Sequence, residues 1–161
     1  MTRRVVLLLM ALGLASSVPA RAQAKPDFSG TWKFATSEPS GYKGSNGWGI
    51  PSTTVVIRQT ANELTIESDQ FGAAMKVVYK LDGTDTIWDA QGSSQSGAST
   101  VVKWRTKAKW DGNKLVLFTW NTALNQLRDI FTLSSGGLNV VRATEQPGPS
   151  TNAVLNYSKG S

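Results

Sequence analysis

Apolar and polar residues alternate with a period of two along most of the chain, in short runs separated by Gly, Asn, Asp and Ser. This alternation is typical of half-buried β-strands, because successive side chains of a strand point to opposite faces. No window after residue 24 keeps the period of an amphipathic helix. The pattern predicts an all-β protein of about ten strands, at residues 30–36, 53–59, 64–69, 73–81, 84–89, 99–110, 115–120, 127–133, 138–144 and 153–159.

The stretch from Thr100 to Trp110 shows the alternation most clearly. One face is predicted to point inward, and it carries Val102, Trp104, Thr106, Ala108 and Trp110. The other face is basic, and it carries Lys103, Arg105, Lys107 and Lys109. We expect the basic face to lie in solvent, where its charge also discourages pairing with other strand edges. Binding of an anionic surface or polymer is the alternative role for it.

Short turns predict how the strands pair. Trp110 is expected opposite Leu115 across residues 111–114, and Gln59 opposite Leu64 across residues 60–63. The same rule pairs Leu133 with Leu138, and Leu81 with Thr84 across Asp82-Gly83. The apolar sets agree in each of these hairpins. Consecutive strands are therefore predicted to pair as a meander around one shared interior.

The connections between strands fall into two groups. If the strands run up and down, the tight turns lie at one end of the molecule, at residues 60–63, 82–83, 111–114 and 134–137. The longer connections then lie at the other end, at residues 37–52, 90–98, 121–126 and 145–152. One closed end and one looped end describe a cup with a mouth, and loops on a rigid scaffold often carry binding sites. The chain is predicted to form an antiparallel up-and-down β-barrel of about 8–10 strands.

Residues 27–34 read Asp-Phe-Ser-Gly-Thr-Trp-Lys-Phe, so that Gly30 and Trp32 stand at the entry to the first predicted strand. This Gly-x-Trp start resembles the N-terminal strand of the calycin superfamily, which comprises the lipocalins and the fatty-acid-binding proteins. Lys109-Trp110-Asp111-Gly112 and Asn156-Tyr157-Ser158-Lys159 are similar to later strands of fatty-acid-binding proteins. The resemblance implies a lipocalin-like barrel in which Gly30 and Trp32 form the closing motif and the interior holds a small apolar molecule.

Residues 1–24 are predicted to be a secretory signal peptide. Arg3 and Arg4 precede an apolar run from Val5 to Leu14, and Ala22-Gln23-Ala24 is a small-residue cleavage site. An uncleaved membrane anchor is the alternative, but the apolar run is shorter than the roughly 20 residues that span a bilayer. We therefore expect residues 25–161 to form a single domain, exported to the periplasm or the extracellular space, with no membrane span.

The charge balance indicates solubility rather than a particular partner. The whole chain has 17 Lys and Arg against 11 Asp and Glu, and three of the basic residues lie in residues 1–24. The mature chain would therefore carry 14 basic and 11 acidic residues, a net charge of +3. That charge does not indicate binding of nucleic acid.

The chain contains no Cys and no His. It therefore has no disulfide, no thiolate nucleophile and no imidazole base, and the usual ligands of zinc and copper are missing. The carboxylates show no spacing that pairs an acid with a base. We expect no cofactor, no metal and no enzymatic activity. A non-metal enzyme built on the same barrel is an alternative.

A group of inward-facing aromatic and sulfur side chains is suited to an apolar ligand, because ligand pockets are mostly apolar. The group consists of Met75, Tyr79, Trp88, Trp104 and Phe131. Small residues at neighbouring inward positions, such as Thr106 and Ala108, leave space among these side chains. The alternative is a filled barrel in which the same side chains pack on one another.

A charged pair, Asp129 opposite Arg142, is also predicted to face inward near the mouth. Arg142 is a candidate for holding the acidic head group of a ligand, and the alternative is a structural pair that neutralises itself.

Trp48 lies in the Gly- and Pro-rich connection at residues 37–52. It is a candidate ligand contact, either as part of a lid over the mouth or as a plug of the barrel top.

These residues predict an exported, monomeric binding protein that carries or sequesters a small hydrophobic molecule inside the barrel. A carbohydrate-binding or adhesion module is the alternative, because the mature part contains all six Trp residues and sugar rings stack on aromatic faces. That alternative requires Tyr42, Trp48 and Trp120 to form one exposed platform.

Overall fold

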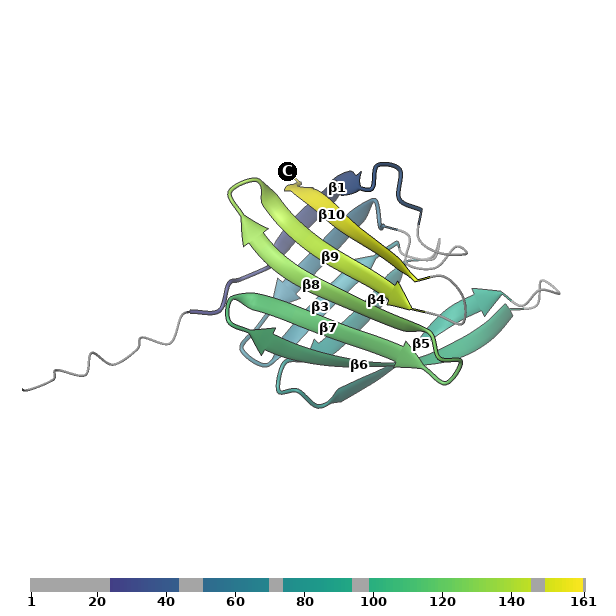
Figure 1. Ribbon diagram of the computed structural model, residues 1–161. Helices are drawn as coiled ribbons and strands as arrows, with labels where there is room; N and C mark the ends of the chain where they lie inside the picture. Colours follow the sequence, from purple (N-terminus) through teal and green to yellow (C-terminus); the bar gives the residue numbers. More distant parts are fainter. Residues whose placement is uncertain (1–23, 44–50, 70–73, 94–98, 146–149, 161) are drawn as a thin grey trace, which may run out of the picture.

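The computed structural model describes residues 24–43, 51–69, 74–93, 99–145 and 150–160 (Figure 1). Within these ranges the chain is all β, as predicted. Its strands are β1 (Gly30–Glu38), β2 (Thr54–Gln59), β3 (Glu63–Ser68), β4 (Met75–Lys80), β5 (Asp85–Ser93), β6 (Ser99–Asp111), β7 (Lys114–Asn121), β8 (Gln126–Ser134), β9 (Gly137–Glu145) and β10 (Thr151–Lys159). No helix among the described residues is long and apolar enough to cross a membrane.

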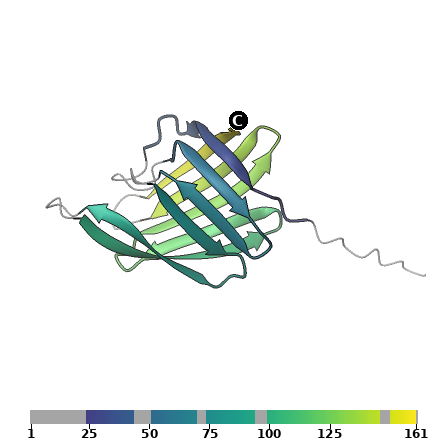
Figure 2. The same ribbon diagram turned by 180° about the vertical axis from the view of Figure 1, so that it is seen from behind.

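The ten strands form one antiparallel sheet in the order β4-β3-β2-β1-β10-β9-β8-β7-β6-β5. The sheet curls so that the green and yellow strands β7 to β10 face the purple and blue strands β1 to β4 across the interior (Figures 1 and 2). Strand β1 joins the two halves by pairing with β2 on one side and with β10 on the other. The prediction of an up-and-down barrel is therefore confirmed, and the barrel is nearly closed.

The predicted pairing of β4 with β5 is wrong. These strands are the two ends of the sheet order, and no ladder joins Leu81 to Thr84. One bond through a side chain links the two strands here, because the Lys80 backbone N–H donates to the Thr86 hydroxyl (3.0 Å). Within the turn, the Thr84 backbone N–H donates to the Asp82 carboxylate (2.8 Å). The two strands therefore stay near each other at the turn without forming a ladder.

The other predicted hairpin registers are confirmed. Trp110 pairs with Leu115, Gln59 with Leu64, and Leu133 with Leu138. Each register keeps the apolar residues on the inner face, because a slip of one residue would turn the whole set outward. The inner faces of the strands therefore surround one common interior.

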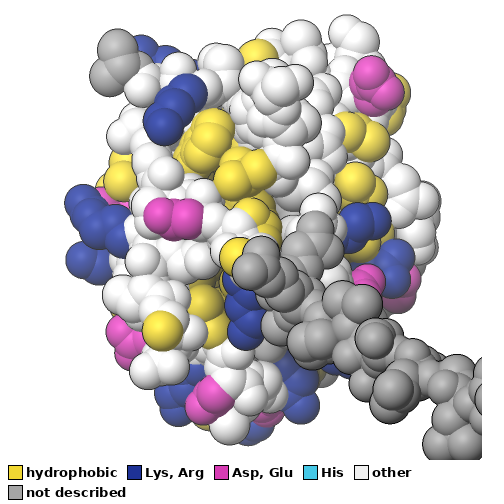
Figure 3. Space-filling view, turned by 90° about the vertical axis from the view of Figure 1, so that its left-hand side faces the viewer, with side chains coloured by type: hydrophobic (Ala, Val, Ile, Leu, Met, Phe, Trp, Pro, Cys, Tyr) yellow, Lys and Arg dark blue, Asp and Glu magenta, His cyan; other side chains and the backbone are white. Residues whose placement is uncertain are grey.

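The end of the barrel with the tight turns is closed by aromatic side chains. Trp32 is buried, and its Nε1 donates to the carbonyl oxygen of Phe28 (2.9 Å). Phe28 is fully buried, stacks on Trp110 with ring centroids 6.0 Å apart, and meets Phe131 edge-on. Gly30 has a φ of +148°, a conformation that favours glycine at the turn into β1. Figure 3 looks onto this end, where charged side chains surround a smaller hydrophobic group.

Candidate functional site

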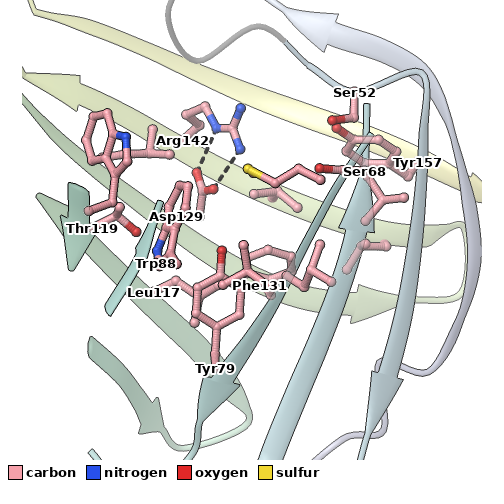
Figure 4. A pocket seen from close by; sticks show the side chains of 18 residues that line it. Ser52, Ser68, Tyr79, Trp88, Leu117, Thr119, Asp129, Phe131, Arg142 and Tyr157 are labelled. Carbon is pink, nitrogen blue, oxygen red and sulfur yellow. Dashed lines mark hydrogen bonds and ion pairs between the residues drawn. The ribbon is translucent and has the colours of Figure 1, made fainter. Parts of the chain in front are cut away.

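A cavity lies inside the barrel above this aromatic floor (Figure 4). Every strand except β1 contributes to its wall, because the inward position of each strand points toward the same space. The residues that line it are Ser52, Val55, Ile66, Ser68, Met75, Val77, Tyr79, Trp88, Trp104, Leu117, Thr119, Leu127, Asp129, Phe131, Leu138, Val140, Arg142 and Tyr157. The wall is mostly apolar, with polar groups at a few positions.

The cavity is hollow but narrow. Its empty space is about 770 Å³, a value that includes the part open to solvent, whereas the centre of a water molecule can occupy only about 60 Å³. The smaller value describes the enclosed interior better, because it leaves out crevices too tight for any atom. Since roughly 10–15 Å³ of such space admits one water, the interior has room for a few water molecules.

Two tryptophans form a rigid part of the wall at the join of β5 and β6. Trp88 and Trp104 are cross-strand partners, and their rings stack with centroids 5.9 Å apart. The Trp88 Nε1 donates to the Thr106 hydroxyl (2.9 Å), which lies 2.8 Å from the Thr119 hydroxyl on β7. This chain of hydrogen bonds holds the ring faces in place and satisfies the buried hydroxyls.

The charged pair predicted from the β8–β9 register faces the cavity. Arg142 donates from Nε to Asp129 Oδ1 (2.8 Å) and from Nη2 to Asp129 Oδ2 (2.7 Å), a bidentate arrangement. Both residues are only 6% exposed. Burial alone would lower the pKa of Arg142, but the adjacent Asp129 carboxylate outweighs it and raises that pKa. The charge of Arg142 is therefore balanced by the carboxylate that it contacts.

Two tyrosines add hydroxyl groups to the wall. Burial, and then the nearby charge of Asp129, raises the pKa of Tyr79 above its ordinary value. Burial raises the pKa of Tyr157 to about 12. Both phenols are therefore neutral near pH 7, and each can donate a hydrogen bond. Figure 4 shows the Tyr79 hydroxyl directed toward the side of the cavity that holds Asp129.

Six of the seven predicted ligand-binding residues line this one cavity: Met75, Tyr79, Trp88, Trp104, Phe131 and Arg142. The seventh, Trp48, lies outside the described residues. Gly30 and Trp32, the predicted closing motif, lie at the closed end, where Trp32 belongs to the buried core. Residues 1–23 of the predicted signal peptide are also outside the described residues.

Sequence reasoning missed several groups at the site. Ser52 lines the cavity from two residues before β2, and Ser68 from the last position of β3, where an alternating pattern no longer specifies a face. Tyr157 could have been found, because the alternation of Ala153, Leu155 and Tyr157 along β10 places it on the inner face.

Other candidate surfaces are less distinctive. The basic face of β6 is partly neutralised by its neighbour β5, since Lys103 lies 2.9 Å from Asp89, and Arg105 and Lys107 each lie 3.7 Å from Asp85.

Tyr42 and Trp120 do not form one platform. Tyr42 bonds to Thr151 of β10, whereas Trp120 stacks on Phe118 of β7, with β8 and β9 between them.

No protein-family model matches the chain, and no curated protein matches it in sequence. Solved structures do match it. A structure described as the REP1-NXSQ fatty acid transporter has a TM-score of 0.57 at 15% identity, covering 83% of this chain and 96% of that one. Echinococcus granulosus fatty-acid-binding protein 1 has a TM-score of 0.52 at 12% identity, covering 83% and 98%.

Zebrafish ileal bile acid-binding protein, solved with cholic acid, has a TM-score of 0.50 at 14% identity, covering 83% of this chain and 98% of that one. At such low identities the likeness concerns the fold. With the ten-stranded, nearly closed barrel, it shows that this chain has the fold of the calycin superfamily. The resemblance first seen around Gly30 and Trp32 is therefore confirmed at the level of the fold.

Proposed function

We propose that this protein is an exported carrier or scavenger that holds a small hydrophobic molecule inside its barrel. The observation that carries the proposal is the internal cavity, which has an apolar wall, a few placed polar groups and an aromatic floor. Ligand sites have this composition, because apolar area supplies affinity while a few polar groups fix orientation. A core devoted to stability alone would have little reason to enclose a paired aspartate and arginine.

The similar structures support the same proposal. Their names describe a fatty acid transporter, a fatty-acid-binding protein and a bile acid-binding protein. We extend to this chain the general role of binding a hydrophobic ligand in the barrel, without catalysis. Export rests on the features of residues 1–24, and action as a monomer remains part of the proposal.

A variant that fills the cavity tests the proposal without adding a charge. Val77 faces the cavity from β4, and Val78 beside it is 40% exposed. We expect Val77→Phe to weaken binding of the neutral dye Nile red by about tenfold or more, since the added ring occupies the ligand's space. The measurement is a fluorescence titration of residues 25–161.

Val78→Phe is the matched control, because it makes the same change on the opposite face of the same strand. It should bind Nile red as the wild type does. Equal loss of binding in the two variants, or binding unaffected by Val77→Phe in a folded protein, would place the dye outside the barrel and contradict the proposal. Thermal unfolding of both variants shows whether they are folded.

A further inference from the structure

We infer that the ligand of this cavity is a slender amphiphile with an uncharged, hydroxyl-bearing head group, of the class of fatty alcohols and monoacylglycerols. This inference rests on the proposed function and specifies its ligand class. Three properties of the site lead to it: the net charge of the wall, its hydrogen-bonding groups and its width.

The wall has no net charge to offer an ionic head group. Among the described residues that line the cavity, Asp129 and Arg142 are the charged ones, and they form a buried bidentate pair. A carboxylate that entered this space would lose its hydration and gain no unbalanced cation in return. It would also meet the Asp129 carboxylate, a charge of its own sign.

The connections at the mouth do not change this balance. The sequence at residues 44–50, 70–73, 94–98 and 146–149 contains no Asp, Glu, Lys or Arg. Charged residues beside these connections belong to the described part of the chain. Lys43, Asp69 and Glu145 are exposed there, where solvent screens them. The neutrality of the interior therefore does not depend on those connections.

The polar groups of the wall suit a hydroxyl. Asp129 accepts two hydrogen bonds from Arg142, and a carboxylate can accept about four. The Tyr79 hydroxyl, close enough to Asp129 for its charge to act on the phenol, makes no hydrogen bond to a described residue. A ligand hydroxyl can donate to a carboxylate and accept from a phenol at once, whereas an ionised acid can only accept.

The width of the cavity favours a single chain. Only about 60 Å³ of the cavity is open to the centre of a water molecule, so little of its interior has room for a broad ligand. An extended alkyl chain needs little more clearance than a file of water molecules, whereas a fused-ring skeleton is broader. The stacked rings of Trp88 and Trp104, with the hydrogen bond from Trp88 to Thr106, form part of this wall.

The experiment compares ligands that share one chain and differ in the head group. Dodecanol, monododecanoylglycerol and dodecanoate compete with bound Nile red on wild-type residues 25–161 at about pH 8, where the acid is ionised. We expect dodecanol and monododecanoylglycerol to bind at least about tenfold more tightly than dodecanoate. Dodecanoate binding as tightly as dodecanol would overturn the inference and leave the proposed function standing.

A charge variant tests the cause of the preference. Asp129→Asn leaves the charge of Arg142 uncompensated, so dodecanoate should gain about tenfold or more in affinity and overtake dodecanol. Asp89→Asn removes the same charge from the outer face, where Asp89 pairs with Lys103, and should leave the order unchanged. A folded Asp129→Asn protein that still prefers dodecanol would contradict the role of the pair.

The outcomes separate the two proposals. If Nile red and all three amphiphiles fail to bind the folded wild type, the proposed function fails and the inference fails with it. If Asp129→Asn does not fold, the wild-type ratio of dodecanol to dodecanoate affinity decides the inference by itself. Native mass spectrometry of each mixture confirms that one amphiphile occupies one chain.

Discussion

At the scale of single residues, Asp129 and Arg142 are the feature that hydrophobic packing does not explain. Removing a charge from water costs several kcal/mol, and a pair offsets this cost only with good geometry. Here the geometry is bidentate, and register fixes it, because the two residues are direct cross-strand partners on β8 and β9. The pair therefore places polar groups in the cavity while keeping the barrel neutral.

Removing one member of the pair should lower the free energy of unfolding more than replacing both members does. We expect Arg142→Met to lower the free energy of unfolding by about 3–5 kcal/mol, because it leaves the Asp129 carboxylate buried without its cation. The double variant Asp129→Leu with Arg142→Met should recover most of that loss, since well-packed apolar residues often replace a buried pair at little cost. Urea denaturation measures both, and a double variant as unstable as the single one would contradict this view.

Site residues were predictable from the sequence where they lie within the alternating apolar and polar pattern of a strand. Tyr79, Trp104 and Phe131 lie within strands, where the neighbours on both sides confirm which face is inward. Ser52 precedes β2 and Ser68 ends β3, so their place at the cavity depends on how the chain enters and leaves the sheet. Bond geometry within the Asp129–Arg142 pair also required the structure, although the register predicted that the two would meet.

At the scale of elements, short turns determine most of the fold. The turns at residues 60–63, 111–114 and 134–137 bring the flanking strands into the expected register, because few residues leave little freedom in how they pair. The turn at Asp82-Gly83 does not. There the Lys80 backbone N–H donates to the Thr86 hydroxyl and the Thr84 backbone N–H donates to the Asp82 carboxylate, and a hydrophobic pattern contains no sign of such bonds.

Gly137, at the β8–β9 turn, lies too close to the backbone of Tyr157 to be replaced by a larger residue. A Cβ on Gly137 would lie 2.1 Å from the carbonyl oxygen of Tyr157, and its φ is +135°. We expect Gly137→Ala to lower the free energy of unfolding by about 2 kcal/mol or more, because strain at such a φ adds to a clash with backbone. It should also weaken ligand binding, since Tyr157 lines the cavity.

Gly136→Ala is the control for this turn. A Cβ there would have only the Ser134 hydroxyl within 4 Å, at 3.8 Å. Its free energy of unfolding, measured in urea, should stay within about 0.5 kcal/mol of the wild-type value, the usual range for a surface substitution. Equal stability of the two alanine variants would show that the turn tolerates a side chain at Gly137, contrary to the geometry described.

At the scale of the whole molecule, the chain is a cup with one sealed end. Phe28, Trp32 and Trp110 fill the end with the tight turns, and the cavity lies between this floor and the looped end. The cup was predictable, since turn lengths alone divide the two ends. Whether it would be hollow was not, because inward aromatic residues suit a filled core and a ligand pocket equally well. The tilt and spacing of the strands decide between these, and a sequence pattern does not contain them.

The first measurement to make is native mass spectrometry of the protein purified from the cells or medium in which it is naturally produced, with organic extraction of whatever is bound. We expect a reproducible adduct of about a few hundred daltons, uncharged in solution, that is retained by Val78→Phe and lost in Val77→Phe. A folded protein that is always bare, and that also takes up none of the amphiphiles offered to it, would contradict the claim that this barrel is a container.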